Sequence, residues 1–151
     1  MALLISEILD KVDKVKSKQE KINILQEHNT PCLRTLMRLN FDNTFAMDLP
    51  EGDPPYKKVT DTPIGYQATT LNLEFRRFYI WLEPNQLSKI KKESIFIELL
   101  ESLHWTEAEV LLACKDRRLT KKYKSIKEDL IREAYPRTLP AKVEPVKAPL
   151  Q

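Results

Sequence analysis

Residues 88–115 read SKIKKESIFIELLESLHWTEAEVLLACK, and this stretch decides the fold class of the chain. Apolar residues recur in it every three or four positions, the period of an α-helix with one buried face. Ser88 supplies a capping hydroxyl for a first helix. Thr106, followed three residues later by Glu109, has the pattern of a capping box and predicts the start of a second helix. The predicted apolar face of the first helix consists of Ile90, Ile97, Leu100 and Leu103.

The same helical period continues on both sides of this stretch. Three short helices are predicted in the N-terminal third, and an aromatic-rich helix is predicted over 71–82. A last helix is predicted to stop at 135–136, where a proline follows a tyrosine. Capping residues for three of these helices are Ser17, Thr30 and Ser125. Strand-like alternation is nowhere sustained, so we predict an all-α single domain of about seven short helices.

Two segments interrupt the helical pattern, and both are rich in proline. Residues 41–69, here called the strap, contain both glycines of the chain and cannot be regular helix throughout. Apolar side chains punctuate the strap, so we expect it to be ordered and to lie across the helices. Residues 137–151 have prolines at four- or five-residue intervals and predict an extended tail. The predicted organisation is therefore a helical domain over 1–136, including the strap, and a tail over 137–151.

Composition excludes several classes of protein. The chain has 151 residues, a formal net charge of +3 and 42% hydrophobic residues, which is typical of a folded domain. Its two cysteines, Cys32 and Cys114, are too far apart for a zinc or redox motif, so we expect buried free thiols in a reducing compartment. The first residues lack the basic region of a signal peptide, and no apolar run is long enough to span a membrane.

No catalytic pattern is visible. The two histidines, His28 and His104, have no ligand or triad spacing, and the scarcity of glycine leaves no loop that would cradle a phosphate. We therefore expect no enzyme activity, no small-molecule substrate, no cofactor and no metal.

A basic cluster lies between the two last predicted helices. Residues 115–124 read KDRRLTKKYK, with six cations against one acid. Such clustering suits phosphate binding, since each neutralised phosphate releases counterions. A solvated connector is the simpler interpretation. The nucleic-acid candidates in this cluster are Lys115, Arg117, Arg118, Lys121, Lys122 and Lys124.

Two further features indicate contacts with a protein partner. Arg77 and Trp81 lie four residues apart on a predicted helix, where they would stack, and this pairing is common at interface hot spots. Packing of Trp81 into the core is an equally good interpretation. The strap carries Pro54, Pro55 and Tyr56, a short extended ligand of the kind that aromatic grooves read.

Four stretches together resemble a known family. They are 49–57 (LPEGDPPYK), 96–104 (FIELLESLH), 107–116 (EAEVLLACKD) and 132–136 (REAYP). The chain is similar to a family of small proteins encoded by T4-like myoviruses, especially those of marine bacteria, whose activity is not established. The resemblance covers roughly residues 1–140 and implies a phage protein made in a bacterial cytoplasm. It implies no catalytic or binding residue.

From these features we expect a non-catalytic phage protein that binds a macromolecular partner in the host cytoplasm. The partner would be a phage or host protein, and the role that of an accessory to replication or transcription or of a modulator of a host protein. Two alternatives stay open. One is a virion component associated with the neck or capsid, and the other is a nucleic-acid-binding protein that acts through residues 115–124.

Overall fold

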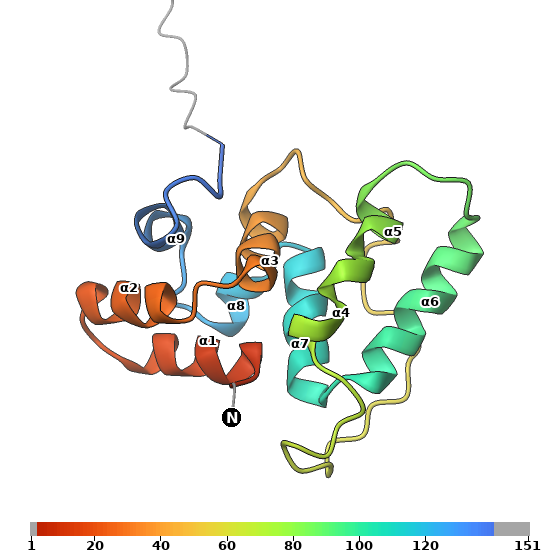
Figure 1. Cartoon of the computed structure of the whole chain (residues 1–151), viewed down its shortest axis with the longest axis horizontal. Coiled ribbons are helices and arrows are strands. Elements are labelled where there is room, and N and C mark those ends of the chain that lie inside the picture. The colour runs from red at the N-terminus through yellow and green to blue at the C-terminus, as the bar shows by residue number, and fades with distance from the viewer. Residues whose placement is uncertain (1–2, 141–151) are drawn as a thin grey trace, which may run out of the picture.

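The computed structural model of the protein describes residues 3–140, and all regular structure within that range is helical (Figure 1). The α-helices are α1 (Ile5–Lys14), α2 (Lys18–Glu27), α3 (Pro31–Phe41), α4 (Leu71–Glu74), α5 (Tyr79–Leu82), α6 (Lys89–Ser102), α7 (Trp105–Lys115), α8 (Leu119–Lys122) and α9 (Glu128–Ala134). A 3₁₀ turn, η1 (Phe75–Phe78), joins α4 to α5. The predicted all-α fold class is confirmed.

Helix α7 is the centre of the molecule. It packs against α1, α3, α6 and α8, and it lies between the N-terminal helices and α6 in Figure 1. Its sequence explains this position, because apolar residues cover almost its whole circumference and a helix that is apolar all round belongs in a core. All residues of α7 from Glu107 to Lys115 are buried except Glu109.

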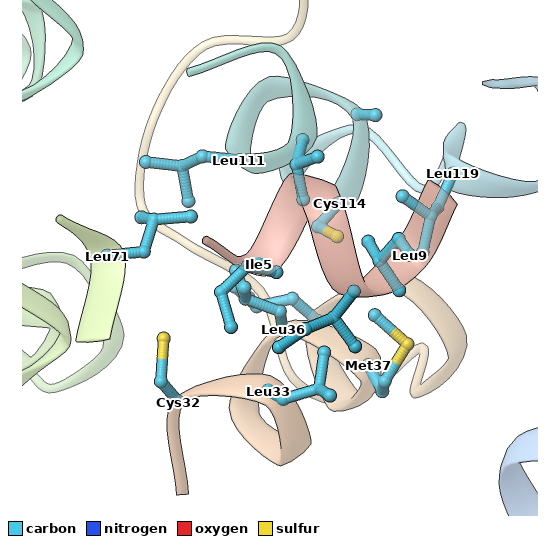
Figure 2. Close-up of a cluster of buried hydrophobic side chains, with 14 of the residues drawn as sticks. Ile5, Leu9, Cys32, Leu33, Leu36, Met37, Leu71, Leu111, Cys114 and Leu119 are labelled. Atoms are coloured by element: carbon cyan, nitrogen blue, oxygen red, sulfur yellow. The ribbon is translucent and has the colours of Figure 1, made fainter. Parts of the chain in front are cut away.

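The core forms where α1, α3 and α7 meet (Figure 2). Ile5 and Leu9 of α1 face Leu33 and Leu36 of α3, and all four side chains are essentially inaccessible to solvent. The predicted burial of both cysteines is confirmed, and both thiols are free. Burial raises the pKa of each thiol, which keeps the cysteines protonated and unreactive.

A buried carboxylate joins three helix N-termini. Glu107, in the first turn of α7, is 0% exposed. Its Oε2 accepts a hydrogen bond from the backbone N–H of Ile5 at 2.9 Å, and its Oε1 accepts one from Leu71 at 3.0 Å. These donors are the first residues of α1 and α4, where backbone N–H groups have no partner within the helix. One carboxylate therefore satisfies two helix starts that are distant in sequence.

Three predicted helix starts are confirmed and two are wrong. Ser17, Thr30 and Ser88 cap α2, α3 and α6, accepting hydrogen bonds from backbone N–H groups three residues on. The N-cap of α7 is His104 instead of Thr106. The Thr106 hydroxyl is hydrogen-bonded to the His104 ring and to Ser6 of α1. The hydroxyl of Ser125 is engaged by Asp13, so α9 starts later and has no side-chain cap.

The predicted apolar face of α6 is also wrong at its first turn. Ile90 is 82% exposed, whereas Phe96 and Leu99 point into the core together with Leu100. The buried row begins only where α6 packs against α7 and the strap.

The aromatic helix predicted over 71–82 consists of three short pieces. Phe78, the last residue of η1, and Trp81 of α5 are both buried, and they pack edge to face with ring centroids 6.1 Å apart. Phe96 of α6 meets the same indole at 5.5 Å.

The packed body continues beyond the predicted boundary at residue 136. Leu139 is buried, and an Arg132 guanidinium nitrogen donates to the carbonyl of Pro140 at 2.6 Å. The remainder of the predicted tail lies outside the described residues. Within residues 3–140, no helix combines the length and apolarity needed to cross a membrane.

Candidate binding groove

Helix α6 holds the strap at two points through charged side chains. Lys92 Nζ lies 2.8 Å from Asp48 Oδ2, and Glu101 Oε2 accepts a hydrogen bond from the backbone N–H of Lys57 at 2.7 Å. The hydrogen bond from Lys92 lowers the pKa of Asp48, and the positive charge of Lys92 adds to this effect, so the carboxylate stays ionised. The strap is thereby attached along α6.

The C-terminal end of α7 holds the middle of the strap. Lys115 Nζ is buried and donates to the carbonyls of Pro50 at 2.8 Å and Gly52 at 3.1 Å. Asp116 accepts from the backbone N–H of Gly52 at 3.0 Å. Gly52 has a φ of +92°, a conformation that other residues rarely adopt, so this turn depends on glycine.

An open groove lies between the strap and helices α7 and α8. Its volume is about 530 Å³. On one side is the strap, with Asp53, Pro54, Pro55, Tyr56 and Lys58; on the other are Glu109, Leu112, Ala113, Arg118, Lys121 and Lys122. The groove therefore forms because the strap lies against α7 and α8, which are more than 50 residues away in sequence.

The charged side chains that line the groove form ion pairs with one another. Glu109 accepts from Lys58 at 3.0 Å and lies 3.4 Å from Lys122 Nζ, so one carboxylate serves two lysines. The hydrogen bond to Glu109 raises the pKa of Lys58, which keeps the ammonium charged. Arg118 lies 3.1 Å from Asp53. Among the described residues, the side chain of Lys121 has no ion-pair partner.

A smaller aromatic cavity of about 210 Å³ adjoins the groove and shares Tyr56 and Lys58 with it. Tyr66 and Trp105 also line this cavity, and the Lys58 ammonium lies 5.3 Å from the Trp105 ring centroid. Tyr66 is 80% exposed. The two cavities form adjacent parts of one face, with aromatic side chains beside the basic ones.

A family of unknown function, DUF6433, matches residues 8–121 of the chain. The chain belongs to this family. The match contains the strap, α6, α7 and most of the groove. The chain matches none of the curated proteins.

The structure of this DUF6433 protein brings two groups of predicted site residues together. Three strap residues and three cations of the basic cluster, predicted as separate sites, line the same groove. They are Pro54, Pro55, Tyr56, Arg118, Lys121 and Lys122. Tyr56 is half-buried, and burial raises the pKa of its hydroxyl.

Two other cations that were predicted as nucleic-acid contacts, Lys115 and Arg117, make hydrogen bonds within the chain, which favours a structural role for them. Lys115 is buried beneath the strap. Arg117 donates to three carbonyls at the end of α3, those of Leu39, Asp42 and Phe45, at 2.6–2.9 Å. The bonds of both side chains therefore hold segments of this chain together. Lys124 is exposed but lies outside the groove.

Trp81 was predicted to be either a core residue or an exposed hot spot, and the structure places it in the core. It is 1% exposed, and its Nε1–H donates to the carbonyl of Lys92 at 2.9 Å. Burial of the ring between Phe78 and Phe96 removes it from any partner. Arg77 is exposed, and its guanidinium pairs with Glu74 at 3.2 Å instead of stacking on Trp81 as predicted.

Five lining residues were not predicted from the sequence: Asp53, Lys58, Glu109, Leu112 and Ala113. A weak signal was present in α7, because Glu109 lies three residues before Leu112 and four before Ala113 and shares their helix face. Nothing in the sequence placed that face opposite the strap.

The buried titratable groups of this protein serve the fold. Both ring nitrogens of His104 are engaged, Nδ1 with Thr106 Oγ1 at 2.7 Å and Nε2 with the Thr62 carbonyl at 2.9 Å. Both oxygens of Glu107 accept backbone hydrogen bonds. Residues 3–140 contain no group of three or more His, Cys, Asp or Glu side chains placed to hold a metal.

Proposed function

We propose that this protein is a non-catalytic binding protein whose groove between the strap and α7–α8 receives a segment of a macromolecular partner. The sequence resemblance supports a phage protein that works in a bacterial cytoplasm, with a phage or host protein as the partner. An accessory to replication or transcription machinery, or a modulator of a host protein, fits such a role.

The observation that carries the proposal is the convergence of two sequence features on one concave surface. The strap brings an extended apolar segment, Pro54–Tyr56, against basic side chains of α7 and α8. A surface that combines an aromatic ring and an arginine with a rigid, proline-fixed backbone binds at low entropic cost. The engagement of His104 and Glu107 in structural bonds supports a binding role over a catalytic one.

A steric block of the groove tests the proposal. Pro55→Trp places a large ring at the groove without changing charge, and Pro63→Trp makes the same change at an exposed strap position outside the groove lining. Each tagged variant is used to capture partners from infected host cells, with and without nuclease, followed by mass spectrometry. We expect a nuclease-resistant protein partner that Pro55→Trp loses and Pro63→Trp retains.

Other results would contradict the proposal. Equal capture by both variants would show that the groove is not the binding site. Capture that disappears with nuclease would support the nucleic-acid alternative, since exposed Lys121 and Lys124 remain available to phosphates. Recovery of the protein from purified virus particles would support the virion alternative.

A further inference from the structure

We infer that the groove binds an extended acidic peptide segment, an inference that rests on the proposed function and names the chemistry of its partner. The strap and α7–α8 form its two walls, as described above. The inference depends on the balance of charge in the groove, on the apolar part of its lining and on the arrangement of its own carboxylates.

The charge balance of the groove favours an anionic ligand. Four cations line it, Lys58, Arg118, Lys121 and Lys122, against two carboxylates, Asp53 and Glu109, which leaves an excess of two positive charges. Lys121 accounts for one of these charges. The other arises because Glu109 is shared between two lysines. A ligand with about two acidic groups would neutralise this excess of positive charge.

The ion pairs within the groove can be exchanged for pairs with a ligand. Arg118 pairs with Asp116, whose side chain is 5% exposed, as well as with Asp53. The side chains of Lys58 and Lys122 are 40% and 35% exposed, so their pairs with Glu109 are screened by water. Exposed ion pairs contribute little to stability. Turning one of these cations from an internal carboxylate to a partner's carboxylate therefore costs the fold little.

The apolar part of the lining favours a peptide over an isolated anion. The strap contributes Pro54, Pro55 and Tyr56 to it, and α7 contributes Leu112 and Ala113. An extended peptide places alternate side chains on opposite sides, so its apolar side chains can contact these residues while acidic ones reach the basic side chains. The volume of about 530 Å³ accommodates a short segment of this kind.

The groove's own carboxylates disfavour a nucleic-acid strand. Asp53 is exposed in the strap, and Glu109 of α7 pairs with both Lys58 and Lys122. A phosphodiester backbone carries a charge at every nucleotide and would meet these carboxylates wherever it followed the groove. A peptide carries its acids at separate positions and avoids them.

Selection from a random peptide library tests the inference on the full-length chain. Displayed dodecapeptides are selected on the wild type, and the best peptide is labelled for fluorescence anisotropy. A groove variant, Lys121→Glu with Lys122→Glu, is compared with a control, Lys124→Glu with Lys127→Glu. Both variants change the net charge equally, and the control residues are exposed and outside the groove. Thermal melting checks that both are folded.

We expect the selected peptides to carry an excess of Asp and Glu. Their affinity should fall at least tenfold in the groove variant, stay within about twofold in the control, and weaken with added salt. Equal weakening in both variants would overturn the assignment to the groove.

Failure of this inference is distinguishable from failure of the proposed function. Neutral or basic peptides that Pro55→Trp no longer binds would overturn the acidic ligand and leave the groove as a protein-binding site. Binding of a labelled single-stranded 20-mer that only the groove variant loses, with no peptide selected, would replace the peptide by nucleic acid. If neither probe responds to any groove substitution, both proposals fall.

Discussion

Replacing Glu107 by alanine tests how the three helix starts are held together. The substitution removes the acceptor of the Ile5 and Leu71 N–H groups and leaves both donors buried without a partner. Glu107→Gln is the milder change, because its amide oxygen accepts one of the two bonds while its NH₂ group faces the other donor. The two variants therefore remove two bonds and one bond respectively.

The magnitude follows from the number and kind of bonds. A hydrogen bond to a charged group contributes about 1.5–3 kcal/mol. Two such bonds are lost in Glu107→Ala, but the cost of burying a carboxylate is recovered. We expect a net loss of about 2–4 kcal/mol in the free energy of unfolding for Ala and about half of that for Gln. A loss of this size is a large share of the stability of an ordinary domain.

Urea unfolding followed by tryptophan fluorescence measures these losses, with buried Trp81 as a probe. The control is Glu98→Ala on the exposed side of α6, expected to stay within about 0.5 kcal/mol of the wild type. A Glu107→Ala protein within about 1 kcal/mol of the wild type would refute the reasoning. So would a Gln variant less stable than the Ala variant.

The same residue predicts a pH dependence. Burial raises the pKa of Glu107 above the usual range of a glutamate. The folded protein therefore holds this proton more tightly than the unfolded chain, and stability falls as pH rises from the ordinary value through the raised one. Glu107→Gln cannot titrate, so its loss of stability relative to wild type should become smaller as pH rises across that window. A difference between the two proteins that is independent of pH would contradict this expectation.

Three further predictions concern single side chains. Trp81→Phe loses the indole bond to Lys92 and should lower the free energy of unfolding by about 1–3 kcal/mol, measured in urea; no change would show that the bond is dispensable. Arg117 has a φ of +59°, so Arg117→Ala should be about 1 kcal/mol less stable than Arg117→Gly, although both lose the same bonds. Equal stabilities would show that the left-handed backbone is not costly here. Hydrogen bonds from Thr44 and Arg38 lower the pKa of Asp42, so its stabilising effect is complete above the ordinary aspartate pKa and is lost as pH falls through the lowered value. Asp42→Asn should therefore lose less stability than wild type between pH 7 and pH 3, and an identical acid profile would contradict this.

The helical fold could be predicted because its signals are local. Ser17 and Thr30 cap helices through bonds within three residues, which a sequence pattern states directly. Thr106 and Ser125 have the same pattern but fail, since their hydroxyls are taken by groups of distant segments. A capping pattern predicts a helix start only where no tertiary partner competes for the side chain.

The groove could be predicted only in its parts. Its basic residues and its proline segment are conspicuous in the sequence, yet their meeting depends on Lys115 and Asp116 binding the strap from more than 60 residues away. The basic cluster was also divided by packing, since neighbouring cations such as Lys115 and Lys121 point into the protein and into solvent respectively. Charge in a sequence does not indicate which of these positions a side chain takes.

The position of Glu107 has a consequence for synthesis of the chain. Ile5 and Glu107 are 102 residues apart, so at a translation rate of about 5–20 residues per second the acceptor is made roughly 5–20 s after the donor. During that interval the apolar side of α1 has neither α7 to cover it nor a carboxylate to complete its first turn. The nascent N-terminal third therefore keeps this apolar surface uncovered, and the ribosome must finish α7 before the core closes.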